Sequence, residues 1–251
     1  MIKKRVKQTI DEQVENVFSD DYLKKVSIRT VTTAENVWRH CNPNTFAEPQ
    51  ALEIGGAGGI TKRLRPGWLI SDVRQSIGVD LVVDAKQLPF AEGQFDLIYA
   101  IDVIHHIENL KDMFDEIHRV LKTGGIFFIR EPYWGPFAQI VWRMFHPEDF
   151  SVNRLFKGNL DQDPMAGNQA LAQALIKKKS RVPSNLFHEE LMLHRIGEMT
   201  GLAFLLSGGA TFRTKFPRNL LIKLDNWELN HRIWLKVFGF STAFYFVKVK
   251  K

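Results

Sequence analysis

The residues with the clearest chemical meaning form a glycine-rich run directly after a short apolar stretch. Residues 51–54 read Ala-Leu-Glu-Ile. The run that follows consists of Gly55, Gly56, Ala57, Gly58 and Gly59. An apolar stretch that meets glycines predicts a buried strand entering a tight turn. Because glycine permits sharp turns and close approach of the backbone to a ligand, this loop predicts a binding site.

The spacing of the glycines argues against a dinucleotide loop, which requires G-x-G-x-x-G. A frame that starts at Gly56 places Thr61 at the third glycine position, and a frame that starts at Gly55 places Ala57 at the second. The loop alone therefore indicates only a nucleotide-like ligand.

Acidic residues end the next two predicted strands. Asp72 ends the strand predicted at 67–72, and Asp84 lies at the end of the strand predicted at 80–85. A carboxylate accepts hydrogen bonds from two donors at once, which suits the hydroxyl groups of a ligand. Asp72 could instead cap a helix. Asp80 is a rival to Asp72 as the ligand-binding carboxylate, but it ranks lower because it opens a strand. Asp96 also begins a strand and is interpreted as structural.

The order of these motifs resembles the class I S-adenosylmethionine-dependent methyltransferases, in particular their type 11-like domain. Glu53 matches the acidic residue before the family's G-x-G-x-G, and Gly55, Ala57 and Gly59 match the three glycine positions, with Ala57 as a departure. The resemblance covers residues 51–129. Its further motifs are residues 84–90, 95–98, 103–107 and 119–125.

The resemblance implies S-adenosyl-L-methionine as cofactor and a set of residues that bind it. In the family, the residue at Asp72 holds the ribose, and Asp84 with its neighbour meets the adenine. The implied set is Glu53, Gly55, Gly56, Ala57, Gly58, Gly59, Asp72, Asp84, Ala85 and Ile101. We expect no metal, because the histidines lack the spacing of a metal site.

Methyl transfer from a sulfonium is an in-line displacement that depends mainly on orientation and exclusion of water. A hydroxyl acceptor is helped by a general base whose pKa lies near the working pH. His105 and His106 follow the fourth predicted strand, where ligands of parallel sheets bind. Glu131 and Tyr133 at the end of the fifth strand are the next candidates. Packing or capping by the histidines, and a plain turn at 131–134, remain alternatives.

Strands that alternate with helical segments predict an α/β fold with a parallel sheet. With the resemblance, the expectation is a Rossmann-like, seven-stranded, mostly parallel sheet with an antiparallel last strand and helices on both faces. The clearest helix is 110–121, with Asn109 as N-cap and Gly124 as C-cap. Only eleven residues separate Asp72 from Asp84, so we expect a loop or single turn at 74–78 where the family has a helix.

The chain divides, in this interpretation, into a helical extension at 1–48 and a methyltransferase domain at 49–251. Residues 133–184 form a helical lid or substrate insertion after the fifth strand, whose aromatic side chains pack on each other or bind an apolar acceptor. After it we expect a helix at 188–200, a strand at 202–206, a helix at 217–237 and a strand at 242–249. The short helix after the glycine loop should end at Pro66.

The bulk properties are those of a cytoplasmic globular protein. Hydrophobic residues make up 45% of the 251 residues, Cys41 is the single cysteine, and neither a secretory signal nor a membrane span is recognisable. The net charge of +6 is scattered, which does not favour a nucleic-acid partner. The helix at 217–237 carries an apolar stripe expected to pack in the core, with peripheral membrane contact as the lesser alternative. The stripe is Leu220, Leu224, Trp227, His231, Trp234 and Phe238.

The predicted function is therefore methyl transfer to a small-molecule acceptor, saccharide or lipid-linked, most readily at oxygen. Two alternatives remain. A non-catalytic binding or assembly module is suggested by Ala57 and the missing helix, and an RNA methyltransferase by the isoelectric point of 9.4. The residues leave the acceptor and the oligomeric state open.

Overall fold

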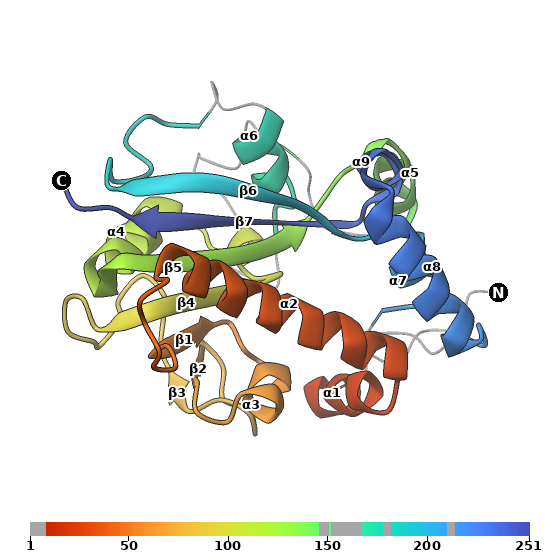
Figure 1. Ribbon diagram of the computed structural model, residues 1–251, viewed down its shortest axis with the longest axis horizontal. Coiled ribbons are helices and arrows are strands. Elements are labelled where there is room, and N and C mark those ends of the chain that lie inside the picture. The colour runs from red at the N-terminus through yellow and green to blue at the C-terminus, as the bar shows by residue number, and fades with distance from the viewer. Residues whose placement is uncertain (1–8, 146–150, 152–166, 178–181, 210–213) are drawn as a thin grey trace.

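The computed structural model describes residues 9–145, 151, 167–177, 182–209 and 214–251. Its centre is a seven-stranded sheet in the order β3-β2-β1-β4-β5-β7-β6 (Figure 1). The strands are β1 (Ala51–Ile54), β2 (Leu69–Asp72), β3 (Leu81–Val82), β4 (Phe95–Ile101), β5 (Leu121–Pro132), β6 (Leu191–Thr200) and β7 (Ser241–Lys248). The first five pair in parallel, and β7 lies antiparallel between β5 and β6. The predicted mostly parallel sheet with an antiparallel last strand is confirmed.

Helices cover both faces of this sheet, as predicted. On one face α2 (Asp21–Cys41) packs through Val31, Ala34 and Trp38. On the other face α4 (Leu110–Val120) and α6 (Leu171–Lys177) share a larger apolar core with β4 and β5. The remaining helices are α1 (Ile10–Phe18), α3 (Ile60–Leu64), the 3-10 turn η1 (Ile104–His106), α5 (Pro136–Phe145), α7 (Leu202–Ser207), α8 (Arg218–Asn230) and α9 (Arg232–Phe238).

The short connections around the glycine loop have the structure that the sequence predicted. Helix α3 ends at Leu64, just before Pro66, and residues 73–78 between β2 and β3 form turns without a helix. Both expectations are confirmed. A proline stops the first helix, and the linker between β2 and β3 is too short for a packed crossover helix.

Helix α4 has the predicted apolar face and the predicted N-cap, since the Asn109 side chain accepts from the backbone N–H of Asp112. The predicted C-cap at Gly124 is wrong. The helix ends at Val120, and Leu121 already opens β5 by pairing with Phe95 of β4. Sheet pairing therefore extends the chain before the glycine is reached.

The element types predicted just before and after residue 201 are wrong. Residues predicted as a helix at 188–200 form the edge strand β6, and residues predicted as a strand at 202–206 form α7. Strand β6 is set by its long antiparallel pairing with β7. Helix α7 is capped from afar, because the Glu228 carboxylate accepts from the backbone N–H groups of Leu202 and Ala203.

The helix predicted at 217–237 is two helices that meet at His231, where the backbone leaves the helical region. The predicted core stripe is also wrong, since Leu220 and Trp227 are exposed. The buried face of α8 is one residue further along, at Leu221, Asp225 and Glu228. This rotation satisfies two buried carboxylates that have partners on α2 and α7.

The segment predicted as a lid, 133–184, is described only in part. Helix α5 leaves the end of β5, and α6 packs on the sheet through Leu171 and Leu175. Trp134 is buried and donates through its ring N–H to Gln169. Residues 146–150, 152–166 and 178–181 lie outside the described part, and with them Phe150 and Phe156 of the predicted lid aromatics. Within the part that is described, no helix combines the length and apolarity that crossing a membrane requires.

Candidate cofactor site

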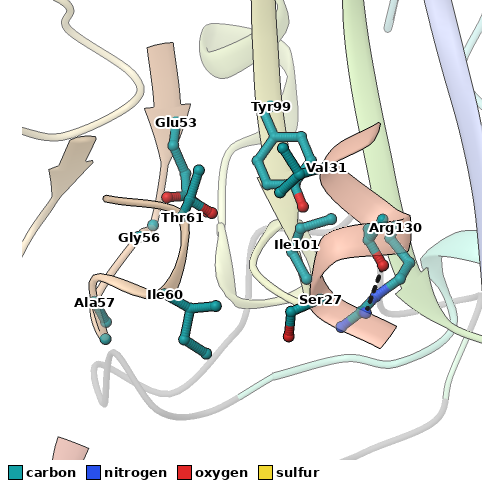
Figure 2. Close-up of a pocket in the computed structure, with 13 residues that line it drawn as sticks. Ser27, Val31, Glu53, Gly56, Ala57, Ile60, Thr61, Tyr99, Ile101 and Arg130 are labelled. Carbon is teal, nitrogen blue, oxygen red and sulfur yellow. Dashed lines mark hydrogen bonds between the residues drawn. The ribbon is translucent and has the colours of Figure 1, made fainter. Parts of the chain in front are cut away.

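An open pocket of about 160 Å³ lies at the carboxyl edge of the sheet, between the loop after β1 and helix α2 (Figure 2). The lining residues come from α2, β1, the glycine loop, α3, β4 and β5. They are Ser27, Thr30, Val31, Glu53, Gly55, Gly56, Ala57, Gly58, Ile60, Thr61, Tyr99, Ile101 and Arg130.

The glycine loop owes its shape to two left-handed residues and one close backbone contact. Gly55 and Gly59 have φ of +71° and +65°, values that side-chain-bearing residues rarely adopt. A Cβ on Gly78 would lie 2.2 Å from the Cα of Gly59. The loop that replaces the missing helix therefore packs backbone against backbone on the cofactor loop, which only two glycines allow.

Replacing Gly78 by alanine is expected to lower the free energy of unfolding by about 1–3 kcal/mol, because the added methyl group overpacks this contact. The Gly67→Ala variant is the matched control, since a Cβ there would meet open space. Urea unfolding of both variants measures the difference. Equal stabilities would contradict the backbone contact.

Glu53, at the end of β1, is the buried carboxylate of the pocket. One of its oxygens, Oε1, accepts from the Thr61 hydroxyl at 2.8 Å, and the other, Oε2, is buried without a hydrogen-bond partner among the described residues. Burial raises the pKa of Glu53 to about 8, aided by the Asp72 charge and opposed by the Thr61 hydrogen bond. A buried acceptor without a donor is costly. This oxygen is therefore suited to receive a donor from a ligand.

Arg130, near the end of β5, lies on the opposite side of the pocket from Glu53 (Figure 2). Its guanidinium pairs with Asp102 and donates to the Thr30 hydroxyl on α2 at 3.4 Å. Its Nε is buried without a partner in the described part of the chain. Asp102 itself has a left-handed backbone, φ +53°, as functional sites often do. The pocket thus places an acidic residue, Glu53, and a basic residue, Arg130, on facing walls.

The predicted ribose and adenine residues lie beside this pocket rather than on its wall. Asp72 is buried and accepts from the backbone N–H of Ala57 at 3.1 Å and of Arg74 at 2.9 Å. Asp84 is exposed and accepts from the backbone N–H of Lys86, while Ala85 is buried in the core. The rival Asp80 is engaged by Lys62 at 2.8 Å. Of the predicted cofactor set, the pocket collects Glu53, the loop 55–58 and Ile101.

His105 and Glu131 form a buried pair on the other face of the sheet. His105 Nδ1 lies 2.5 Å from Glu131 Oε2. Glu131 Oε1 also accepts from the backbone N–H groups of Val103 and Ile104, at 3.2 and 2.8 Å. Because side chains alternate along a strand, Arg130 faces α2 and Glu131 faces the opposite way. The structure thus joins two of the predicted catalytic residues, from segments 26 positions apart.

The other two predicted catalytic residues, His106 and Tyr133, are not part of this buried pair. The ring of His106 sits 4.1 Å from that of His105. Tyr133 is buried, and its hydroxyl donates to the backbone oxygen of Lys236 at 3.4 Å, which ties the exit of β5 to α9. None of the four predicted catalytic residues lines the pocket.

Sequence reasoning did not find the wall formed by α2 and β5. Ser27, Thr30 and Val31 share one face of α2 at offsets of three and four, and Arg130 interrupts an apolar strand. A charged residue inside a strand that should be buried on both faces was the available signal.

His118, His188 and Glu190 also gather far from this pocket, with ligand atoms within 4.8 Å of one another. The two imidazole rings stack at 4.0 Å with an interplanar angle of 12°. Stacked rings direct their nitrogen lone pairs along parallel planes, so both could bind one ion only after rotating apart. His188 is already engaged by Asp115 at 2.8 Å.

Comparison with known proteins gives one family and several partial relatives. The family model described as a methyltransferase domain matches residues 68–129. A sterol 24-C-methyltransferase of Gibberella zeae is 44% identical over 48 residues, which are 19% of this chain and 13% of that protein. An uncharacterized methyltransferase of Synechocystis is 38% identical over 63 residues, 22% of this chain and 30% of that protein. The chain thus matches less than a third of the length of either relative.

Among solved structures, the YcgJ protein of Bacillus subtilis is similar, with 18% identity and a TM-score of 0.45 over 86% of this chain and 97% of that one. The strand order, the family match and the motif order lead to one assignment. The chain carries a class I S-adenosylmethionine-dependent methyltransferase domain.

S-adenosylmethionine is the cofactor of this class, and the pocket residues fit it. Its methionyl end carries an ammonium and a carboxylate, and the facing walls offer a buried carboxylate oxygen and a buried guanidinium N–H, both without partners among described residues. Charge-assisted hydrogen bonds of this kind are the strong ones. Glu53 and Arg130 are therefore the residues suited to hold that end.

Proposed function

We propose that this protein transfers the methyl group of S-adenosylmethionine to an oxygen of a small, saccharide or lipid-linked acceptor. The observation that carries the proposal is the unpaired Oε2 of Glu53, buried beside the glycine loop. A fold kept only for assembly has no need to bury a carboxylate oxygen without a donor, because such an atom destabilises the protein. This argues against the non-catalytic binding module, although Ala57 departs from the family's glycine.

The cofactor supplies a methyl group on a sulfonium, activated for in-line displacement. This chain binds and orients the reactants through Glu53, Arg130 and the predicted Asp72 and Asp84. We assign the proton to His105, which lies beside the pocket rather than in it, at the carboxyl edge of the sheet that both share, and whose Nδ1 pairs with the Glu131 carboxylate. His105 takes the acceptor's hydroxyl proton as the methyl–oxygen bond forms and the methyl–sulfur bond breaks, and it later returns the proton to water, while Glu131 stabilises the imidazolium.

The acceptor class is supported by the names of the partial relatives. Several fungal relatives are called sterol 24-C-methyltransferases, and an apolar, lipid-class acceptor is compatible with the membrane-facing surface proposed below. Their names specify carbon as the accepting atom, whereas the His105–Glu131 pair is suited to take the proton of a hydroxyl acceptor. The accepting atom is therefore part of the test.

The experiment is to incubate the protein with methyl-labelled S-adenosylmethionine and a fractionated cell extract. Label in a lipid or saccharide fraction, released by ether cleavage or saponification, supports O-methylation. Label in a carbon-bound methyl overturns the choice of oxygen, and label in RNA favours the RNA alternative. Cofactor binding without transfer to any fraction overturns the enzymatic proposal.

With the labelled fraction as substrate, His105→Gln is expected to lower kcat about 100-fold or more, the usual contribution of a general base. Cofactor affinity should be unchanged, and the acidic limb of the pH profile of kcat should disappear. His106→Gln is the matched comparison at the neighbouring ring. A loss confined to His106→Gln would contradict the assignment to His105.

A further inference from the structure

Three helices at the carboxyl edge of the sheet present apolar side chains to solvent. Helix α5 follows β5 directly, and α9 leads into β7, whose first residue, Ser241, pairs with Pro132 at the end of β5. Figure 1 shows α5, α8 and α9 together at the end of the molecule toward which β5 points. Their exposed apolar residues, here called the apolar face, are Ile140, Met144, Leu220, Trp227, Ile233 and Val237.

A row of aromatic contacts joins α8 to α9 and α9 to α5. Trp227 of α8 meets Trp234 of α9 at 5.3 Å between ring centroids, Trp234 stacks on Phe238 at 4.0 Å, and Phe238 meets Phe137 of α5 at 5.2 Å. These ring contacts join α5, α8 and α9, the three helices that carry the apolar face. Ile233, at 82% exposure, is its most exposed member. Monomeric proteins rarely leave a contiguous apolar surface of this kind without a partner.

The charges of this surface are of one sign. Helices α5 and α9 contain no acidic residue. The two acids of α8 are buried and engaged, Asp225 by Arg29 and Glu228 by the start of α7. The exposed charged side chains of α8 and α9 are Lys223, Arg232 and Lys236. The exposed charged side chains of α8 and α9 are thus all positive.

We propose that this apolar face docks on the surface of a bilayer that contains anionic lipid. Exposed aliphatic and tryptophan side chains with flanking lysines are the composition of interfacial membrane helices. A second copy of the chain would bring like charges together, and a cationic partner would be repelled, whereas anionic headgroups complement Lys223 and Lys236. The docked edge is the one that carries the cofactor pocket, so a lipid-linked acceptor could enter without leaving the membrane.

The test is co-sedimentation of the full chain with vesicles of phosphatidylcholine and phosphatidylglycerol in a 7:3 ratio, against vesicles of phosphatidylcholine alone, without cofactor. Binding is expected to the anionic vesicles and to weaken with salt. The Lys223→Gln/Lys236→Gln variant should bind about 30-fold less tightly, about fivefold for each lysine near an anionic surface. The Ile233→Glu/Val237→Glu variant should lose at least about tenfold, since it removes insertion and adds repulsion.

The matched control is Phe46→Glu, because Phe46 is 95% exposed in the loop before β1, at the opposite edge of the sheet. It should bind like the wild type. Equal binding by the Ile233→Glu/Val237→Glu variant, or no binding to anionic vesicles, overturns the proposal. So does a stable dimer in size-exclusion chromatography that these two substitutions dissociate. Because the assay uses no cofactor or acceptor, its outcome is independent of the proposed methyl transfer.

Discussion

Replacement of Glu53 by glutamine is expected to weaken S-adenosylmethionine binding by about ten- to hundredfold, the contribution of a hydrogen bond to a charged group. Glutamine keeps the size of the side chain and an oxygen that accepts from Thr61. It replaces the unpaired Oε2 by an amide, which has no charge to offer an ammonium. Isothermal titration with the cofactor measures the change. The control is Asp80→Asn, which alters a carboxylate held by Lys62 outside the pocket and should leave affinity unchanged.

The same substitution is expected to change how stability depends on pH. Burial raises the pKa of Glu53 from 4.5 to about 8. The folded protein therefore binds this proton more tightly than the unfolded chain. The resulting stability is fully present below pH 4.5 and is lost as pH rises through about 8.

Between pH 6 and pH 8 the wild type should therefore lose about 2 kcal/mol more unfolding free energy than Glu53→Gln, at about 1.4 kcal/mol per pH unit below the folded pKa. Urea unfolding without cofactor at the two pH values gives the comparison. Parallel pH dependences would contradict a protonated, desolvated Glu53. A wild-type affinity for the cofactor that does not rise over the same range would argue against its pairing with an ammonium.

Replacement of Arg29 by methionine is expected to cost about 3–5 kcal/mol of unfolding free energy, because it leaves a buried charge without its partner. Arg29 of α2 binds both carboxylate oxygens of Asp225 on α8, at 2.5 and 3.1 Å, and donates to the backbone oxygen of Met199 at 2.8 Å. Asp225 is only 1% exposed. This ion pair holds α8, which carries part of the apolar face, against α2, which forms one wall of the pocket.

The double variant Arg29→Met/Asp225→Leu should recover most of this loss, since apolar replacement of both partners is often neutral. Arg63→Met is the matched control. Its partner Glu15 is 64% exposed, so its loss should be much smaller than that of Arg29→Met. Chemical denaturation of the wild type and these three variants gives the losses of unfolding free energy to compare. A double variant as unstable as Arg29→Met would contradict a cost that arises from the uncompensated carboxylate.

The sequence by itself determined the features that depend on local pattern. The glycine loop after β1, the short helix before Pro66, the turn region at 73–78 and the capped start of α4 follow from backbone freedom, a missing N–H and a periodic apolar face. The class of protein and the cofactor followed from the family resemblance of several short motifs, because each motif depends on residues adjacent in the chain.

Tertiary contacts decided the features that depend on residues far apart in the chain. Pairing with β7 made residues 191–200 a strand, and Glu228 capped residues 202–207 into a helix. Because Asp225 and Glu228 of α8 have buried partners on α2 and α7, they face the interior, and Trp227 is left exposed. The walls of the pocket and the His105–Glu131 pair arose in the same way, from segments that only the sheet brings to one edge. Local propensity is worth tenths of a kilocalorie per residue, whereas a buried charge without a partner costs several, and so burial overruled the local pattern.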